Sequence, residues 1–104
     1  MAIDRIASFR ALIAKAPQDP FPRYGLAMEF RSRGELEAAA AAFGELIAAF
    51  PDYVPSYLMA GGVAGKLGRA DSARALFERG IEVATARGDT HARGELQSAL
   101  AEVA

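Results

Sequence analysis

Residues 34–51 read GELEAAAAAFGELIAAFP, and residues 68–85 read GRADSARALFERGIEVAT. The two stretches share glycine, alanine, phenylalanine and isoleucine at the same offsets, 34 residues apart. The matching pairs are Gly34 with Gly68, Ala39 with Ala73, Phe43 with Phe77, and Ile47 with Ile81. Phe9, Ile13 and Pro17 continue this register toward the N-terminus. A fixed period of this length is typical of a solenoid, in which similar units stack on one another.

The composition favours a single all-α domain. The chain has 104 residues, of which 52% are hydrophobic, enough for a modest core and too many for a disordered segment. The β-branched and aromatic runs that strands prefer are missing, whereas alanine, the best helix former, is abundant. Cysteine is absent, which excludes a disulfide framework and a thiolate zinc site.

Charge and hydropathy narrow the classes of partner. The net charge of −1 argues against nucleic acid, whose binding needs clustered lysine and arginine. No apolar run approaches the roughly 18 residues that a membrane span requires. Arginine outnumbers lysine ten to two, a bias that accompanies GC-rich bacterial genomes. We therefore expect a bacterial, cytoplasmic protein without a nucleic-acid or membrane partner.

Apolar spacing and the positions of proline and glycine predict about six helices. They cover roughly residues 3–16, 24–33, 35–49, 54–67, 70–86 and 90–103, and residues 18–22 are expected to form a loop. Pro17 and Pro51 end two helices, and Gly34 ends another by taking a left-handed cap conformation. Asp89 or Thr90 is expected to cap the last helix. The short connections favour antiparallel helix hairpins.

These positions resemble the tetratricopeptide repeat motif, whose period is 34 residues. The stretch from Asp19 to Pro51 matches the motif at Leu26, Ala27, Phe30, Gly34, Ala39, Phe43 and Pro51. The stretch from Tyr53 to Thr85 matches it at Tyr57, Gly61, Gly68, Ala73, Phe77 and Gly80. Thr85 replaces the closing proline, so the helix before it is expected to run longer. The resemblance implies a right-handed α-solenoid of antiparallel helix hairpins.

The register divides the single domain, residues 1–104, into four parts. Residues 1–18 form an N-terminal half-repeat helix, residues 19–52 the first repeat, residues 53–86 the second, and residues 87–104 a C-terminal capping helix. Small residues such as Gly61 and Gly80 are expected where helix backbones approach closely beside large aromatic side chains.

In this family the first helix of each unit lines a concave groove. Carried over by position, the partner-binding residues are Phe21, Tyr24, Met28, Arg31, Leu58, Met59, Gly62, Lys66 and Arg93, with Gly25, Ser32, Gly65, Ala92 and Leu96 beside them. Some family members bind a C-terminal carboxylate through lysine, asparagine and arginine in this groove. Those positions here hold Tyr24, Met28, Leu58, Gly62, Ala92 and Leu96, so that clamp is absent. The resemblance therefore implies an apolar groove, although Met28 or Met59 could also be core residues.

Residue chemistry gives no support for catalysis. His91 is the only histidine and has no second histidine or cysteine to complete a zinc site. No serine lies in a nucleophile motif, and the glycines at 61, 62 and 65 lack the ending of a phosphate loop. We expect no enzyme activity, no cofactor and no metal.

Two functions remain. The first is a non-catalytic interaction module that binds a protein, as a peptide or a helix, in the apolar concave groove. The alternative is a structural homo-oligomerisation domain, for example a homodimer, in which a second copy occludes the groove or an end helix. The sequence does not identify the partner.

Overall fold

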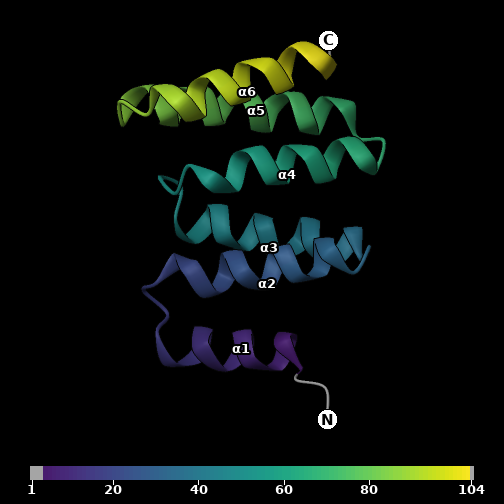
Figure 1. The fold of residues 1–104 in the computed structure, drawn as a ribbon, viewed down its shortest axis with the longest axis vertical. Coiled ribbons are helices and arrows are strands. Elements are labelled where there is room, and N and C mark those ends of the chain that lie inside the picture. The colour runs from purple at the N-terminus through teal and green to yellow at the C-terminus, as the bar shows by residue number, and fades with distance from the viewer. Residues whose placement is uncertain (1–3, 104) are drawn as a thin grey trace.

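The computed structural model describes residues 4–103, and six helices stack there in chain order (Figure 1). They are α1 (Arg5–Lys15), α2 (Pro20–Ser32), α3 (Leu36–Ala49), α4 (Pro55–Lys66), α5 (Ala70–Ala86) and α6 (Thr90–Val103). No strand occurs within residues 4–103, so the predicted all-α solenoid is confirmed. Ile3, which the first helix was expected to include, lies outside the described residues.

The start of α2 differs from the expected loop at residues 18–22. The Asp19 carboxylate accepts a hydrogen bond from the Phe21 N–H at 3.0 Å and so caps the helix, which begins at Pro20. Proline suits the first helical position because its φ is already helical and its missing N–H would have no partner there. Pro20 and Pro22 therefore lie in the first turn of α2, not in a loop before it.

Three glycines end helices in the left-handed conformation. Gly34, Gly68 and Gly88 have φ values of 76°, 77° and 69°. After α2, the Glu35 N–H bonds the Phe30 carbonyl at 3.0 Å, and the same bond pattern recurs after α4 and α5. These bonds satisfy carbonyls that the helix end would leave unpaired. Helix α5, with 17 residues, is longer than α3, with 14, as the loss of the closing proline predicted.

The core lies between the paired helices from α2 to α6. Phe43, Leu46 and Tyr57 are fully buried, and the Tyr24 ring meets the Phe43 ring edge to face with centroids 6.2 Å apart. The Tyr57 hydroxyl donates to the Pro51 carbonyl, which fixes the start of α4 against the end of α3.

Two glycines permit close helix contact, as the sequence suggested. A Cβ on Gly80 would lie 2.6 Å from the Tyr57 Cβ, so only a bare backbone fits between α5 and α4. A Cβ on Gly61 would collide with the Phe77 ring. Large side chains on one helix thus fill the space that glycine leaves on the other.

Helix α1 is held more loosely than the others. None of its residues is buried, and it packs mainly against α2. The Phe9 ring lies where a Cβ on Gly25 would be, and the Arg10 guanidinium lies 6.0 Å from the centre of the Phe30 ring. Leu12 remains 48% exposed, so the outer side of α1 offers apolar surface to solvent.

Candidate protein-interaction groove

Two hollows run along α4 and α6. The first, of about 310 Å³, has an apolar floor and lies between these helices and Tyr24 of α2. Its lining consists of Tyr24, Val54, Pro55, Leu58, Met59, Asp89, His91, Ala92, Glu95 and Leu96. The second hollow, of about 430 Å³, is lined by Leu58, Gly61, Gly62, Gly65, Lys66, Phe77, Ala99, Glu102 and Val103. Because Leu58 belongs to both, we name the two hollows together the α4–α6 trough.

Glycines form part of the trough wall on α4. Gly62 is exposed, and nothing lies within 4 Å of the place where its Cβ would be. The same holds for Gly65, one turn further along. The bare backbone at these two positions adds open space to the second hollow, which Phe77 also lines.

Charged groups lie mainly on the α6 side of the trough. The Asp89 carboxylate caps α6 by accepting a hydrogen bond from the Ala92 N–H at 3.0 Å, which selects Asp89 over Thr90 as the cap. Glu95 lies 3.3 Å from the exposed His91 ring, and Glu102 lies two turns beyond it. Lys66 is the cation on the opposite wall of the second hollow.

Tyr24 contributes a polar group to this apolar surface. Burial raises the pKa of its hydroxyl above the ordinary value, the neighbouring Tyr53 adds to the rise, and Arg31 opposes it. The hydroxyl therefore stays protonated at neutral pH and can donate a hydrogen bond.

The structure divides the nine predicted partner-binding residues among separate surfaces. Tyr24, Leu58, Met59, Gly62 and Lys66 line the trough. Met28 and Arg31 instead line another hollow, between α1 and α2. Phe21 is 63% exposed, Arg93 is half-buried, and neither lines these hollows.

Sequence reasoning missed part of the trough. Val54, His91 and Glu95 were not predicted as lining residues, and neither were Glu102 and Val103. The two-turn spacing of Glu95 and Glu102 was the available signal, since it places both on one side of α6. Their position beside α4 depends on how α6 packs, which the spacing does not give.

The described residues show no cluster suited to a metal. Within residues 4–103, no group of three or more histidine, aspartate or glutamate side chains could hold an ion. No helix in the same range is both long and apolar enough to cross a bilayer. The expected cytoplasmic location and the expected lack of catalysis stay predictions of the sequence.

Comparison with known proteins identifies the family. A scan of protein-family models and a search of curated protein sequences give no match. Among solved structures, the solution structure of a tetratricopeptide repeat domain protein from Salinibacter ruber is 39% identical, with a TM-score of 0.78. That alignment covers 84% of this chain and 88% of the Salinibacter chain. The chain belongs to the tetratricopeptide repeat family.

Further structures agree with this assignment. A crystal structure of the Salinibacter tetratricopeptide repeat domain protein gives a TM-score of 0.77 at 39% identity, covering 82% of this chain and 94% of that one. A Bordetella parapertussis protein matches in fold with a TM-score of 0.81 at 23% identity, over 99% of this chain and 88% of that chain. Membership in the tetratricopeptide repeat family supports a role in protein–protein interaction.

Proposed function

We propose that this protein binds a partner protein, without catalysis, by taking an apolar peptide or helix into the α4–α6 trough. The observation that carries the proposal is the open space at Gly62. A glycine in the middle of a helix costs about 1 kcal/mol relative to alanine, and at Gly62 no close helix contact offsets that cost. Gly44 on α3 has the same open space, but of the two only Gly62 lines an apolar hollow, beside Leu58 and Phe77, where another molecule can be received.

The lining of the trough suits an apolar partner segment. Leu58, Met59 and Leu96 supply its floor together with Phe77, and methionine adapts its shape to different partners. The Tyr24 hydroxyl and the carboxylates on α6 can fix the orientation of a bound segment. This combination of an apolar groove with a few polar groups is typical of sites that take an amphipathic helix.

The test compares two arginine substitutions at exposed helical glycines. Gly62→Arg fills the trough, whereas Gly44→Arg places the same side chain on α3, where Gly44 also has nothing within 4 Å of its Cβ position. Both variants are expected to keep the circular dichroism spectrum and melting temperature of the parent protein or to exceed them, because arginine is the better helix former.

Binding is then measured with immobilised protein and a bacterial lysate. We expect proteins retained by the parent chain and by Gly44→Arg to be lost from Gly62→Arg. If Gly62→Arg unfolds, Gly62 is a packing residue and the trough is closed. If all three proteins retain the same partners equally, binding takes place on another surface.

A further inference from the structure

Among residues 4–103, an apolar surface at α1 and α2 is left uncovered. A hollow of about 640 Å³ lies between these helices, and Arg5, Phe9 and Leu12 of α1 and Met28 of α2 belong to its lining. Leu12 is one of two large hydrophobic side chains that the described part of the chain leaves exposed, at 48%. We name this surface the α1–α2 seat.

The 34-residue register shows what covers such a surface elsewhere in the molecule. Leu46 and Phe43, the counterparts of Leu12 and Phe9, are fully buried. They lie on α3, which packs against α2, and the Tyr24 ring of α2 contacts Phe43. In the next unit, α4 packs against α5 in the same way that α2 packs against α3, and α4 also contacts α6 (Figure 1). A helix that precedes the pair is thus the natural occupant of a seat of this kind, and no helix within residues 4–103 covers the α1–α2 seat.

Helix α6 is the counterpart of α2 and α4 and presents an uncovered face. The face that α4 turns to α5 contains Ala60, Gly61 and Ala64, all buried. The residues 34 positions later are Gly94, Glu95 and Ser98, and all three are exposed. The outer face of α6 therefore keeps two small residues, which leave room for a protruding side chain. It gains the carboxylate of Glu95, which also lines the trough and so lies at the border between the two surfaces.

The two ends carry opposite charges at matching register positions. Within the stack, Ala27 of α2 and Ala39 of α3 are fully buried where these helices pack. At the ends of the described chain, Glu95 replaces Ala27 in the register and Arg5 replaces Ala39. Two alanines that are buried on the packed helices α2 and α3 thus correspond, at the two ends of the described chain, to one acidic and one basic residue.

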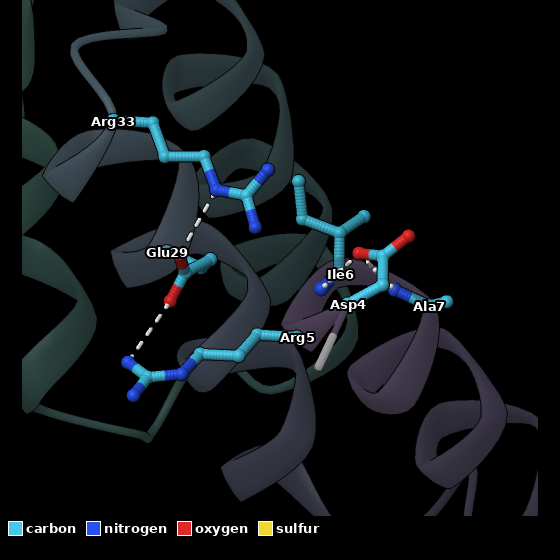
Figure 2. Close-up of polar contacts among 6 residues, drawn as sticks. All are labelled: Asp4, Arg5, Ile6, Ala7, Glu29 and Arg33. Carbon is cyan, nitrogen blue, oxygen red and sulfur yellow. Dashed lines mark hydrogen bonds and ion pairs between the residues drawn. The ribbon is translucent and has the colours of Figure 1, made fainter. Parts of the chain in front are cut away.

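Arg5 has capacity for a second acidic partner. Glu29 lies 3.7 Å from Arg5 and also accepts a hydrogen bond from Arg33 at 3.0 Å, so a single carboxylate serves two guanidinium groups (Figure 2). Asp4 is engaged in capping α1 through the N–H groups of Ile6 and Ala7 (Figure 2). The Arg5 side chain reaches toward Glu29 on α2 (Figure 2) and still remains 72% exposed to solvent.

We propose that copies of this chain associate head to tail, with the outer face of α6 of one copy on the α1–α2 seat of the next. Leu12 enters the shallow face at Gly94 and Ser98, and Arg5 pairs with Glu95 of the neighbouring copy. The two surfaces differ, so the contact is heterologous, and it generates open chains or a ring rather than a symmetric dimer.

The experiment measures molar mass by light scattering over a range of protein concentrations. The mass of the parent chain is expected to rise above the monomer value of 11.0 kDa as concentration increases. Leu12→Glu blocks the seat and Glu95→Arg blocks the α6 face. Each variant alone is expected to stay at the monomer mass at every concentration. A mixture of the two is expected to form a 1:1 dimer, because each retains one working end.

Ala48→Glu, on an exposed position of α3, is the matched control and is expected to assemble like the parent chain. Circular dichroism melting confirms that the exposed substitutions leave the fold intact. A parent chain that stays monomeric throughout overturns the proposal. If assembly survives Glu95→Arg but is lost in Leu12→Glu, two seats bind each other, and the head-to-tail proposal is overturned. The proposal is also overturned if the mixture of the two blocked variants does not form a dimer.

Discussion

At the scale of single residues, two glycines on neighbouring helices have opposite roles. Gly80 lies in a contact so close that a Cβ would be 2.6 Å from the Tyr57 Cβ and 3.0 Å from Leu96. In contrast, nothing lies within 4 Å of the place where a Cβ on Gly62 would be, and the φ of Gly62 is not in the left-handed region. Both glycines lie within helices, so the helix propensity of glycine has the same effect at both positions. Only their surroundings differ: Gly80 packs against another helix, whereas Gly62 is exposed.

This difference predicts that alanine substitutions at the two glycines change the free energy of unfolding in opposite directions. Gly80→Ala is expected to destabilise the protein by about 1–3 kcal/mol, because a Cβ next to the Tyr57 main-chain region forces α4 and α5 apart. Gly62→Ala is expected to stabilise it by about 0.5–1 kcal/mol through helix propensity. Urea denaturation measures both free energies of unfolding. Equal effects at the two sites would contradict the packing described for α4 and α5.

Phe43 is the residue on which the repeat packing depends most. It is fully buried and contacts Tyr24 across the α2–α3 pair. We expect Phe43→Ala to cost about 3–5 kcal/mol, the usual loss for a buried phenylalanine. A small domain has only about 5–15 kcal/mol of stability, so the melting temperature should fall steeply. An unchanged melting curve would show that Phe43 is not at the centre of the stack.

At the scale of helices, α6 covers the side of α5 and α4 that the core leaves open. Leu96 is 1% exposed, and its side chain lies 3.0 Å from the place where a Cβ on Gly80 would be. Helix α6 also contacts α4, which makes it one wall of the trough as well as a cover. The outward side of α6 carries Gly94, Glu95 and Ser98, which are all exposed.

Truncation after Gly88 tests this covering role. We expect the shortened chain to expose apolar surface on α4 and α5, bind a hydrophobic dye and aggregate. The substitution Leu96→Ala keeps the helix and removes only its main anchor, with an expected loss of about 2–5 kcal/mol. If the truncated chain remains as stable and as dispersed as the parent, α6 is not a structural cover.

At the scale of the whole molecule, packing is uneven along the stack. Helix α1 has no buried residue, whereas α4, in the interior, has six. In a solenoid each unit is stabilised by its neighbours, so a terminal helix with one main contact opens most easily.

Hydrogen exchange is expected to follow this gradient. Backbone amides in α1 should exchange faster than those in α4, because α1 can detach while the rest of the stack stays folded. Measurement by mass spectrometry or NMR at neutral pH resolves the two segments. Equal protection of α1 and α4 would mean that the molecule opens only as one cooperative unit.

The sequence alone determined the features that depend on local chemistry. The 34-residue period placed Phe43 and Phe77 in the core, and Gly34 and Gly68 at helix ends. These predictions succeeded because an aromatic on a helical stripe must be buried, and because glycine adopts positive φ without a steric cost. The predicted start of the second helix, at residue 24, was wrong, because Pro20 after Asp19 begins a helix as readily as proline elsewhere ends one.

Tertiary structure decided how the predicted groove residues are grouped. Tyr24, Leu58 and Gly62 line the trough, but Met28 and Arg31 face the α1–α2 seat. Register positions fix which residues share a side of one helix, whereas the packing of one helix on the next fixes which sides meet. That packing depends on contacts distant in the sequence, such as Gly80 against Tyr57 and Leu96, and on the close approach that glycine permits there.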